Sequence, residues 1–217
     1  MRRNGIIFDL DGTLWEVIDS TYYSVNKIAN KYGLNEITKE TVCNVFGLNK
    51  VDSAKLFFPY LDIDKSVKLM DEMAIINIKN LKKNGGNIYP NLEKNLIILK
   101  EKFDLFIVSN TAEDDYINTF LVSSNLKKYF SDYIAASKLQ ITKSDAIKLI
   151  IEQNELKNAV YVGDTVKDEE ASKNAGIKFI YAKYGFGKNV KAQYSINSIN
   201  ELPDVLEKLN FGNELEE

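Results

Sequence analysis

The chain has 217 residues, of which 45% are hydrophobic and 27% are charged. This length fits one or two domains, and this composition is typical of a globular protein rather than a disordered one. The formal net charge of −3 gives no broadly basic surface, so we expect neither nucleic acid nor a membrane as a partner. No stretch approaches the roughly 18 consecutive apolar residues of a membrane-spanning helix.

The sequence contains no histidine. This excludes Ser-His-Asp and Cys-His machinery, phosphohistidine chemistry and zinc sites with histidine ligands. Acid–base catalysis must then depend on carboxylates, lysine or tyrosine. The single cysteine, Cys43, cannot form an internal disulfide, which suits a reducing compartment. Asp9 and Asp11 interrupt the apolar run after the basic N-terminus, so we predict no signal peptide and a cytoplasmic location.

The first predicted element is a short buried strand at residues 6–8, which ends in the polar turn 9–13. Residues 16–83 follow, with apolar residues at helical spacing and no convincing strand. The expected helices in this segment cover about 18–32, 39–46, 51–58 and 64–81.

After the breaker at residues 84–87 the pattern changes to an alternation of strands and helices. The expected strands are 105–108, 133–135, 159–162, 178–181 and a weak last strand at 194–196. The expected helices begin near residues 92, 113, 144, 168 and 202. This alternation predicts an α/β fold with a Rossmann-like parallel sheet covered by helices on both faces. We assign residues 1–15 and 84–217 to this core domain, and 16–83 to an inserted all-helical domain.

Polar side chains stand where several predicted strands end, which is where open parallel sheets bind ligands. Asp9 and Asp11 follow the first strand, residues 109–111 end the second, and Asp164 follows the strand at 159–162, with Asp168 four residues later. The spacing places each aspartate pair on one side of its element.

Four carboxylates in one place repel each other, and a hard divalent cation with oxygen ligands relieves this. Mg²⁺ is the usual ion when a phosphate is also bound. Ser109 and Lys143 add a hydroxyl donor and a positive charge, which a phosphoryl group with negative charge on its oxygens requires. The pattern therefore favours phosphoryl chemistry.

Together these motifs resemble those of the haloacid dehalogenase superfamily, in the same order and on the expected elements. They are Asp9-Leu10-Asp11-Gly12-Thr13, Ser109-Asn110, Lys143 and Gly163-Asp164-Thr165-Val166-Lys167-Asp168. The resemblance covers essentially the whole chain and is greatest to the phosphoglycolate phosphatase-like branch. It implies that the helical segment 16–83 is the family's cap domain.

The resemblance also implies roles for the acidic residues. Asp9 would be the nucleophile that forms an aspartyl-phosphate. Asp11 would protonate the leaving oxygen and then activate water. Asp9, the backbone carbonyl of Asp11 and Asp164 would hold Mg²⁺, and Asp168 would bind the ion directly or through water.

Further roles follow from the same resemblance. Ser109 and Asn110 would hold the transferring phosphoryl group, and Lys143 would bridge the nucleophile and the phosphate. Gly12 and Thr13 would shape the turn beside the substrate.

Some of these assignments have alternatives. Asp168 could serve only to favour a helix N-terminus. Lys138 is a rival for Lys143, and Ser144, where family members often have proline, could simply cap the next helix. Lys50, between two helices of the segment, could meet an anionic group or be an ordinary surface lysine.

The predicted function is a Mg²⁺-dependent phosphatase for a small phosphorylated metabolite, such as a phosphoglycolate-like phosphomonoester. Four alternatives remain: a phosphoglucomutase, a pyrophosphatase, a phosphonate hydrolase, or a non-catalytic metabolite-binding protein on the same fold. The mutase branch employs a cap histidine, which this chain lacks. We expect a monomer or a homodimer.

Overall fold

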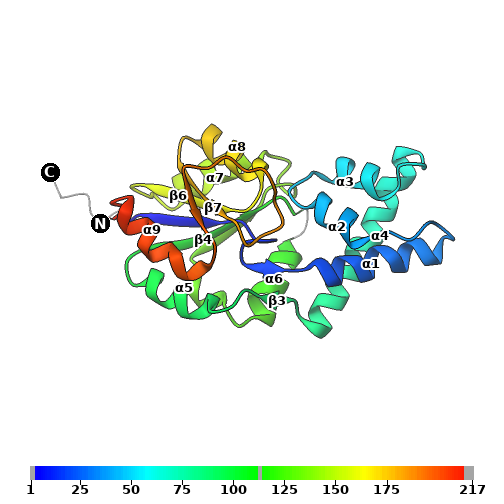
Figure 1. Ribbon diagram of the computed structural model, residues 1–217, viewed down its shortest axis with the longest axis horizontal. Coiled ribbons are helices and arrows are strands. Elements are labelled where there is room, and N and C mark those ends of the chain that lie inside the picture. The colour runs from blue at the N-terminus through cyan, green and yellow to red at the C-terminus, as the bar shows by residue number, and fades with distance from the viewer. Residues whose placement is uncertain (1–2, 112–113, 213–217) are drawn as a thin grey trace.

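A six-stranded parallel sheet forms the centre of the computed structural model, which describes residues 3–111 and 114–212 (Figure 1). The strands are β1 (Gly5–Phe8), β4 (Asp104–Ser109), β5 (Asp132–Ala135), β6 (Ala159–Gly163), β7 (Lys178–Ala182) and β8 (Tyr194–Ile196). Their order across the sheet is β5-β4-β1-β6-β7-β8, and each neighbouring pair is parallel. The predicted fold class is confirmed, including the weak last strand.

Strand β1 lies inside the sheet, between β4 and β6. Ile6 and Phe8 face one apolar cluster and Ile7 faces the other, and all three side chains are fully buried. A strand buried on both faces needs apolar residues at every position, which explains the uninterrupted apolar run in the sequence.

Helices cover both faces of the sheet. One face packs against α5 (Leu92–Lys100), α6 (Asp114–Ser123) and α9 (Leu202–Lys208). The other packs against α7 (Lys143–Gln153) and α8 (Val166–Ala175), so the core has three layers (Figure 1). Two short 3₁₀ helices, η1 (Lys127–Tyr129) and η2 (Ile199–Glu201), complete this part. The predicted start of α6 at residue 113 lies outside the described residues.

The segment between β1 and the rest of the sheet is helical, as predicted. It contains α1 (Ile18–Lys31), α2 (Lys39–Val45), α3 (Lys50–Phe57) and α4 (Ile63–Asn84). These helices share an apolar cluster of their own, which includes Ile28, Phe57, Phe58 and Met70. The segment extends from one side of the sheet (Figure 1). The division into domains at 15/16 and 83/84 remains a prediction.

Two very short strands join the helical segment to the sheet. β2 (Trp15–Glu16) pairs antiparallel with β3 (Asn87–Ile88), so the two chain crossings lie side by side. The sequence does not predict this pair, because a strand of two residues has no periodicity. No described helix is both long and apolar enough to span a bilayer.

Candidate active site

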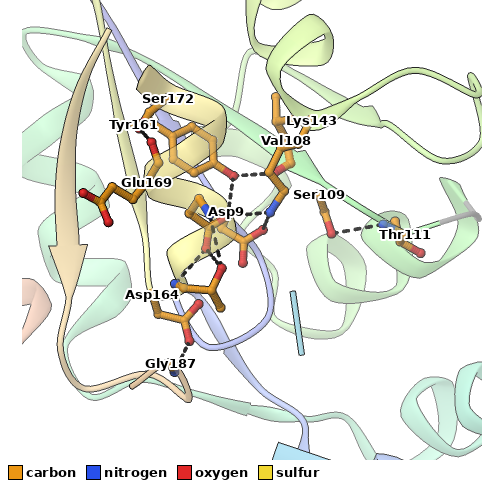
Figure 2. A network of polar contacts seen from close by, with 12 residues as sticks. Asp9, Val108, Ser109, Thr111, Lys143, Tyr161, Asp164, Glu169, Ser172 and Gly187 are labelled. Carbon is orange, nitrogen blue, oxygen red and sulfur yellow. Dashed lines mark hydrogen bonds and ion pairs between the residues drawn. The ribbon is translucent and has the colours of Figure 1, made fainter. Parts of the chain in front are cut away.

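The predicted site residues follow three neighbouring strands. Asp9 follows β1, Ser109 ends β4 and Asp164 follows β6, and β4, β1 and β6 are adjacent in the sheet. Parallel strands end at the same edge, so these residues meet there (Figure 2). Lys143, the first residue of α7, reaches the same place.

Lys143 joins two buried carboxylates. Its Nζ donates to Asp9 Oδ1 at 2.7 Å and to Asp168 Oδ1 at 2.6 Å (Figure 2). All three residues are buried, with exposed fractions of 6% for Asp9, 7% for Lys143 and 0% for Asp168. Lys138, the rival lysine, is exposed. Ser144 does not cap α7, because the N-cap is Thr142, whose side chain accepts from the backbone N–H of Asp145.

Burial and the neighbouring opposite charges shift the pKa values of Asp9 and Lys143 in opposite directions. Burial raises the pKa of Asp9 well above its usual value, although the Lys143 ammonium opposes the shift. Burial also works against the charge on Lys143, but Asp168 and Asp9 outweigh it and hold the pKa of Lys143 well above its usual range. Lys143 therefore stays cationic and partly neutralises the carboxylates around it.

Asp168 also caps the helix on which it lies. The backbone N–H and the hydroxyl of Thr165 donate to Asp168 Oδ2 at 2.9 and 2.7 Å, and the Thr165 side chain accepts from the Asp168 N–H. This is a reciprocal capping box at the start of α8. The helix-capping alternative is thus present together with the ion pair to Lys143, and both Asp168 oxygens are engaged.

Asp164 is fully buried and is held from one side only. Its Oδ2 accepts from the backbone N–H groups of Phe186 and Gly187, at 2.6 and 3.2 Å. Its Oδ1 is buried and has no hydrogen-bond partner among the described residues. Burial raises the pKa of Asp164 to about 7, with a further contribution from Asp168.

Two glycines allow the backbone to approach Asp164 closely. Gly12 has a φ of +85°, and a Cβ at Gly12 or at Gly185 would overlap the Asp164 carboxylate. Thr13 is fully buried, and its carbonyl accepts from the Tyr184 hydroxyl at 3.0 Å. Positions 12 and 185 therefore need glycine for steric reasons.

The carboxylates fit a divalent cation. Asp9, Asp164 and Asp168 each offer one oxygen, and these oxygens lie within 4.8 Å of one another. The buried, unpaired Oδ1 of Asp164 is the strongest indication, because such an atom is costly unless a ligand satisfies it. The donor set consists of carboxylate oxygens, which hard cations prefer.

Asp11 lies apart from this cluster. Its Oδ1 accepts from the Tyr116 hydroxyl on α6 at 2.8 Å. Burial raises the pKa of Asp11 to about 6, and the Tyr116 hydrogen bond and Lys143 limit the shift. In the sequence, Tyr116 is only one of the apolar residues of the helix that is expected from about residue 113. The two residues are 105 positions apart, and nothing in the sequence links them.

Ser109 and Asn110 lie at the end of β4. Ser109 is buried and its hydroxyl accepts from the backbone N–H of Thr111 at 3.4 Å. The Asn110 carbonyl accepts from the Ser137 hydroxyl at 2.6 Å, which ties this loop to the segment after β5. Both residues line the cavity described next.

A cavity of about 760 Å³ lies between this edge of the sheet and the helical segment. The core contributes Asp9, Asp11, Ser109, Asn110, Tyr116 and Lys143 to its wall. Gly12, Thr13, Asp164 and Asp168 do not line it. The helical segment touches the core beside the cavity, where the Phe46 and Phe186 rings lie 4.4 Å apart and Gly47 faces Thr165.

Comparison with known proteins agrees with the family resemblance of the sequence motifs. The family model "Haloacid dehalogenase-like hydrolase" matches residues 6–182. A phosphoglycolate phosphatase of Aquifex aeolicus is 29% identical over 194 residues, which are 84% of this chain and 86% of that protein. One from Haemophilus influenzae is 25% identical over 199 residues, 87% of this chain and 89% of that protein.

Solved structures agree in fold. A haloacid dehalogenase-like hydrolase from Streptococcus pneumoniae has a TM-score of 0.83 at 18% identity and covers 93% of this chain and 97% of its own. A predicted phosphoglycolate phosphatase from Haemophilus somnus also has a TM-score of 0.83, at 20% identity, with 94% and 98% covered.

Proposed function

Because the chain belongs to the haloacid dehalogenase-like hydrolase family, we propose that it is a Mg²⁺-dependent phosphatase that acts through an aspartyl-phosphate. The observation that carries this proposal is the buried cluster of Asp9, Lys143, Asp164 and Asp168, with Asp11 held separately by another partner. Asp9 and Asp11 lie on one turn but have different environments. A nucleophile and a general acid–base catalyst require such a difference.

Asp9 is the proposed nucleophile. Lys143 holds its Oδ1, and no described residue donates a hydrogen bond to its Oδ2. Attack of a carboxylate oxygen on phosphorus forms the aspartyl-phosphate bond and breaks the bond between phosphorus and the leaving oxygen. Lys143 fixes the orientation of Asp9 and compensates its charge before the reaction.

Asp9, Asp164 and the backbone carbonyl of Asp11 are the proposed Mg²⁺ ligands, with Asp168 contributing directly or through water. The ion would supply positive charge next to the carboxylates and the phosphoryl oxygens. Ser109 and Asn110, which line the cavity at the end of β4, are the proposed hydrogen-bond donors to those oxygens.

Asp11 is the proposed acid and base. A carboxyl group with a pKa near 6 can be protonated or ionised close to neutral pH. The protonated form gives its proton to the leaving alcohol. The carboxylate then takes a proton from the water that attacks the aspartyl-phosphate, which releases phosphate and restores Asp9. The Tyr116 hydrogen bond orients Asp11 for both steps.

The helical segment is the proposed cap. It contacts the core next to the site and closes the cavity over the carboxylates. Exclusion of bulk water strengthens the electrostatic interactions inside the cavity. It also limits the water that reaches the aspartyl-phosphate. A lidded site favours a small phosphorylated metabolite, and phosphoglycolate is the first compound to test because curated relatives bear that name.

The test is phosphate release from a panel of phosphorylated metabolites and pyrophosphate, with and without Mg²⁺. We expect Mg²⁺-dependent turnover in the wild-type protein and a loss of at least about a hundredfold in Asp9→Asn. Asp204→Asn, at an exposed position on α9, is the matched control and should keep full activity. Turnover that persists in Asp9→Asn, or that ignores Mg²⁺, would contradict the mechanism.

A further inference from the structure

Part of the cavity wall is apolar. Beyond the carboxylates, the helical segment contributes the side chains Phe46, Leu48, Phe57, Met70, Met73 and Ile78. The cavity volume of about 760 Å³ lies in the upper half of the ~300–1,000 Å³ range typical of pockets that enclose a drug-sized ligand. A two-carbon phosphorylated acid would leave most of this apolar surface without a contact.

Among the residues that the structure describes, the same wall offers no unpaired positive charge. Both arginines of the chain are at positions 2 and 3, before β1, so the helical segment has none. Among the described residues that line the cavity, Lys50 is paired with Asp71, and Lys143 is paired with Asp9 and Asp168. A substrate carboxylate in this cavity would have to compete with Asp71 for Lys50, or with Asp9 and Asp168 for Lys143.

The same wall also carries polar side chains, and Asn77 on α4 is one of the buried ones. It lines the cavity and is only 6% exposed. Its Oδ1 accepts from the Ser20 hydroxyl at 2.6 Å. The Ser24 hydroxyl, which donates to the Ser20 carbonyl at 2.7 Å, lies 3.3 Å from the same oxygen. Asn80 Nδ2 donates to Ser20 Oγ at 2.9 Å, and Asn84 Nδ2 donates to Asn80 Oδ1 at 2.7 Å. This chain of donors directs the Ser20 hydroxyl hydrogen towards Asn77.

In this arrangement the two ends of the Asn77 amide differ. Its oxygen is occupied within the helical segment, and no described residue accepts a hydrogen bond from its Nδ2. The Nδ2 atom is also not among the fully enclosed unpaired atoms, so it can reach the cavity that Asn77 lines. Asn77 thus presents a preorganised N–H donor to any molecule in the cavity.

From these observations we propose that the alcohol part of the substrate is an uncharged, ring-sized group with a hydrogen-bond acceptor that Asn77 Nδ2 binds. Asn77 is then a specificity-determining residue, held in place by Ser20. The inference rests on the proposed phosphatase function and narrows its substrate class, away from short phosphorylated acids.

The test uses three phosphomonoesters: phosphoglycolate, benzyl phosphate and the pyridylmethyl phosphates. Benzyl and pyridylmethyl esters have the same shape and differ by one ring nitrogen that accepts a hydrogen bond. We expect kcat/KM for the ring esters to exceed that for phosphoglycolate by at least about tenfold. The best pyridylmethyl isomer should have a KM about five- to tenfold below that of benzyl phosphate, as one hydrogen bond provides.

Asn77→Leu removes the donor and approximately keeps the volume. It should abolish the advantage of the pyridylmethyl ester while kcat for benzyl phosphate changes less than about threefold. Asn30→Leu, at an exposed position on α1, is the matched control. Ser20→Ala is a smaller change that should reduce the same advantage in part, and circular dichroism would show whether each variant folds. An advantage unchanged in folded Asn77→Leu or Ser20→Ala would overturn the role of Asn77.

Binding separates this inference from the phosphatase proposal. The same esters are titrated calorimetrically into the Asp9→Asn variant with Mg²⁺, where no turnover is needed. Tighter binding of the ring esters supports the inference even if wild-type protein hydrolyses nothing, a result that would contradict only the phosphatase proposal. Preference for phosphoglycolate, in binding or in kcat/KM, would overturn the substrate class and leave the phosphatase proposal intact.

Discussion

At the residue scale, Lys143 is the cation on which the buried carboxylates depend. It donates to both Asp9 and Asp168, and none of the three side chains has appreciable access to solvent. Removing one partner from a buried ionic cluster is much more costly than removing an exposed charge, because the remaining charges stay buried without compensation. The Lys143 ammonium should therefore affect both the free energy of unfolding and the proposed reaction.

This predicts a double effect for Lys143→Met. The substitution keeps the length of the side chain but leaves Asp9 and Asp168 without their cation, so we expect a loss of about 3–5 kcal/mol in the free energy of unfolding at neutral pH. We also expect a loss of at least about a hundredfold in kcat, measured with the best substrate. Denaturant unfolding and steady-state kinetics are the measurements. Lys138→Met, at the exposed rival position, should keep kcat within about threefold, and equal effects of the two variants would refute the assignment.

The sequence predicts those site residues that lie close to one another along the chain, and does not predict contacts between distant positions. Asp9 and Asp11, or Asp164 and Asp168, lie within a few positions of each other, so spacing and a strand end suffice to predict their proximity. Tyr116 is different, because its hydroxyl meets Asp11 only when α6 packs against the sheet. Its sequence pattern is that of a core aromatic, which it also is.

At the scale of elements, the loop after β7 holds Asp164 from behind. Phe186 and Gly187 direct their N–H groups at Asp164 Oδ2, and a Cβ at Gly187 would overlap the Asp164 backbone carbonyl. The sequence of residues 184–187 resembles a loop common in this branch of the family, but a plain glycine turn after a strand explains it as well. The close approach explains why small residues are needed here.

We therefore predict that Gly187→Ala weakens Mg²⁺ binding. The added methyl group must displace the loop, so Asp164 loses donors and the geometry that leaves its Oδ1 available for a cation. Isothermal titration with Mg²⁺ should show an affinity at least about tenfold lower.

Gly176→Ala is the control for this prediction. Gly176 ends α8 with a φ of +77°, and nothing lies within 4 Å of an added Cβ. This variant should lose about 1 kcal/mol of stability from backbone strain and keep its Mg²⁺ affinity. A normal affinity in Gly187→Ala would show that the loop does not support the cation site.

The elements themselves were predictable to different degrees. The strands of the sheet have apolar runs or breakers that mark them. The four helices before α5 have apolar residues at helical spacing, and α2, α3 and α4 also have side-chain N-caps, such as Thr38 before α2. The strand order was not predictable, because nothing in the sequence of β1 shows that it pairs with β4 and β6 rather than with others. Pairing of β2 with β3 depends on the return of the chain 71 residues later, as the bond from Asn87 to Glu16 illustrates.

At the scale of the whole molecule, the fold concentrates negative charge where water is scarce. Two neighbouring parallel strands, β1 and β6, bring aspartates to one edge, and the helical segment covers that edge. Folding without a cation must therefore bury carboxylates that would be better hydrated in the unfolded chain. The protein gives up stability to keep a site that binds cations, and this cost should depend on pH.

The sign of that dependence follows from Asp164. Its pKa in the folded protein is about 7, against 3.8 for a free side chain, and the pKa of Asp11 is raised in the same direction to about 6. Between pH 3.8 and about 7 the folded state binds more protons than the unfolded state, so raising the pH in this range destabilises the folded state. The stabilising contribution is complete below pH ~4 and is lost as the pH rises through ~7.

In EDTA, we therefore expect the difference in Tm between wild-type protein and Asp164→Asn to change with pH. Wild-type protein should lose stability relative to the variant as the pH rises from 4.5 to 7.5, because the neutral amide does not titrate and leaves no buried charge. Added Mg²⁺ should reverse this loss in the wild type at pH 7.5 and have little effect at pH 4.5, where protons occupy the ligands. Calorimetric scans of both proteins, with EDTA and with Mg²⁺, provide the measurement. If the Tm difference is constant over this range, or if Mg²⁺ stabilises Asp164→Asn as strongly as the wild type, then Asp164 is not the buried carboxylate that couples cation binding to the stability of the fold.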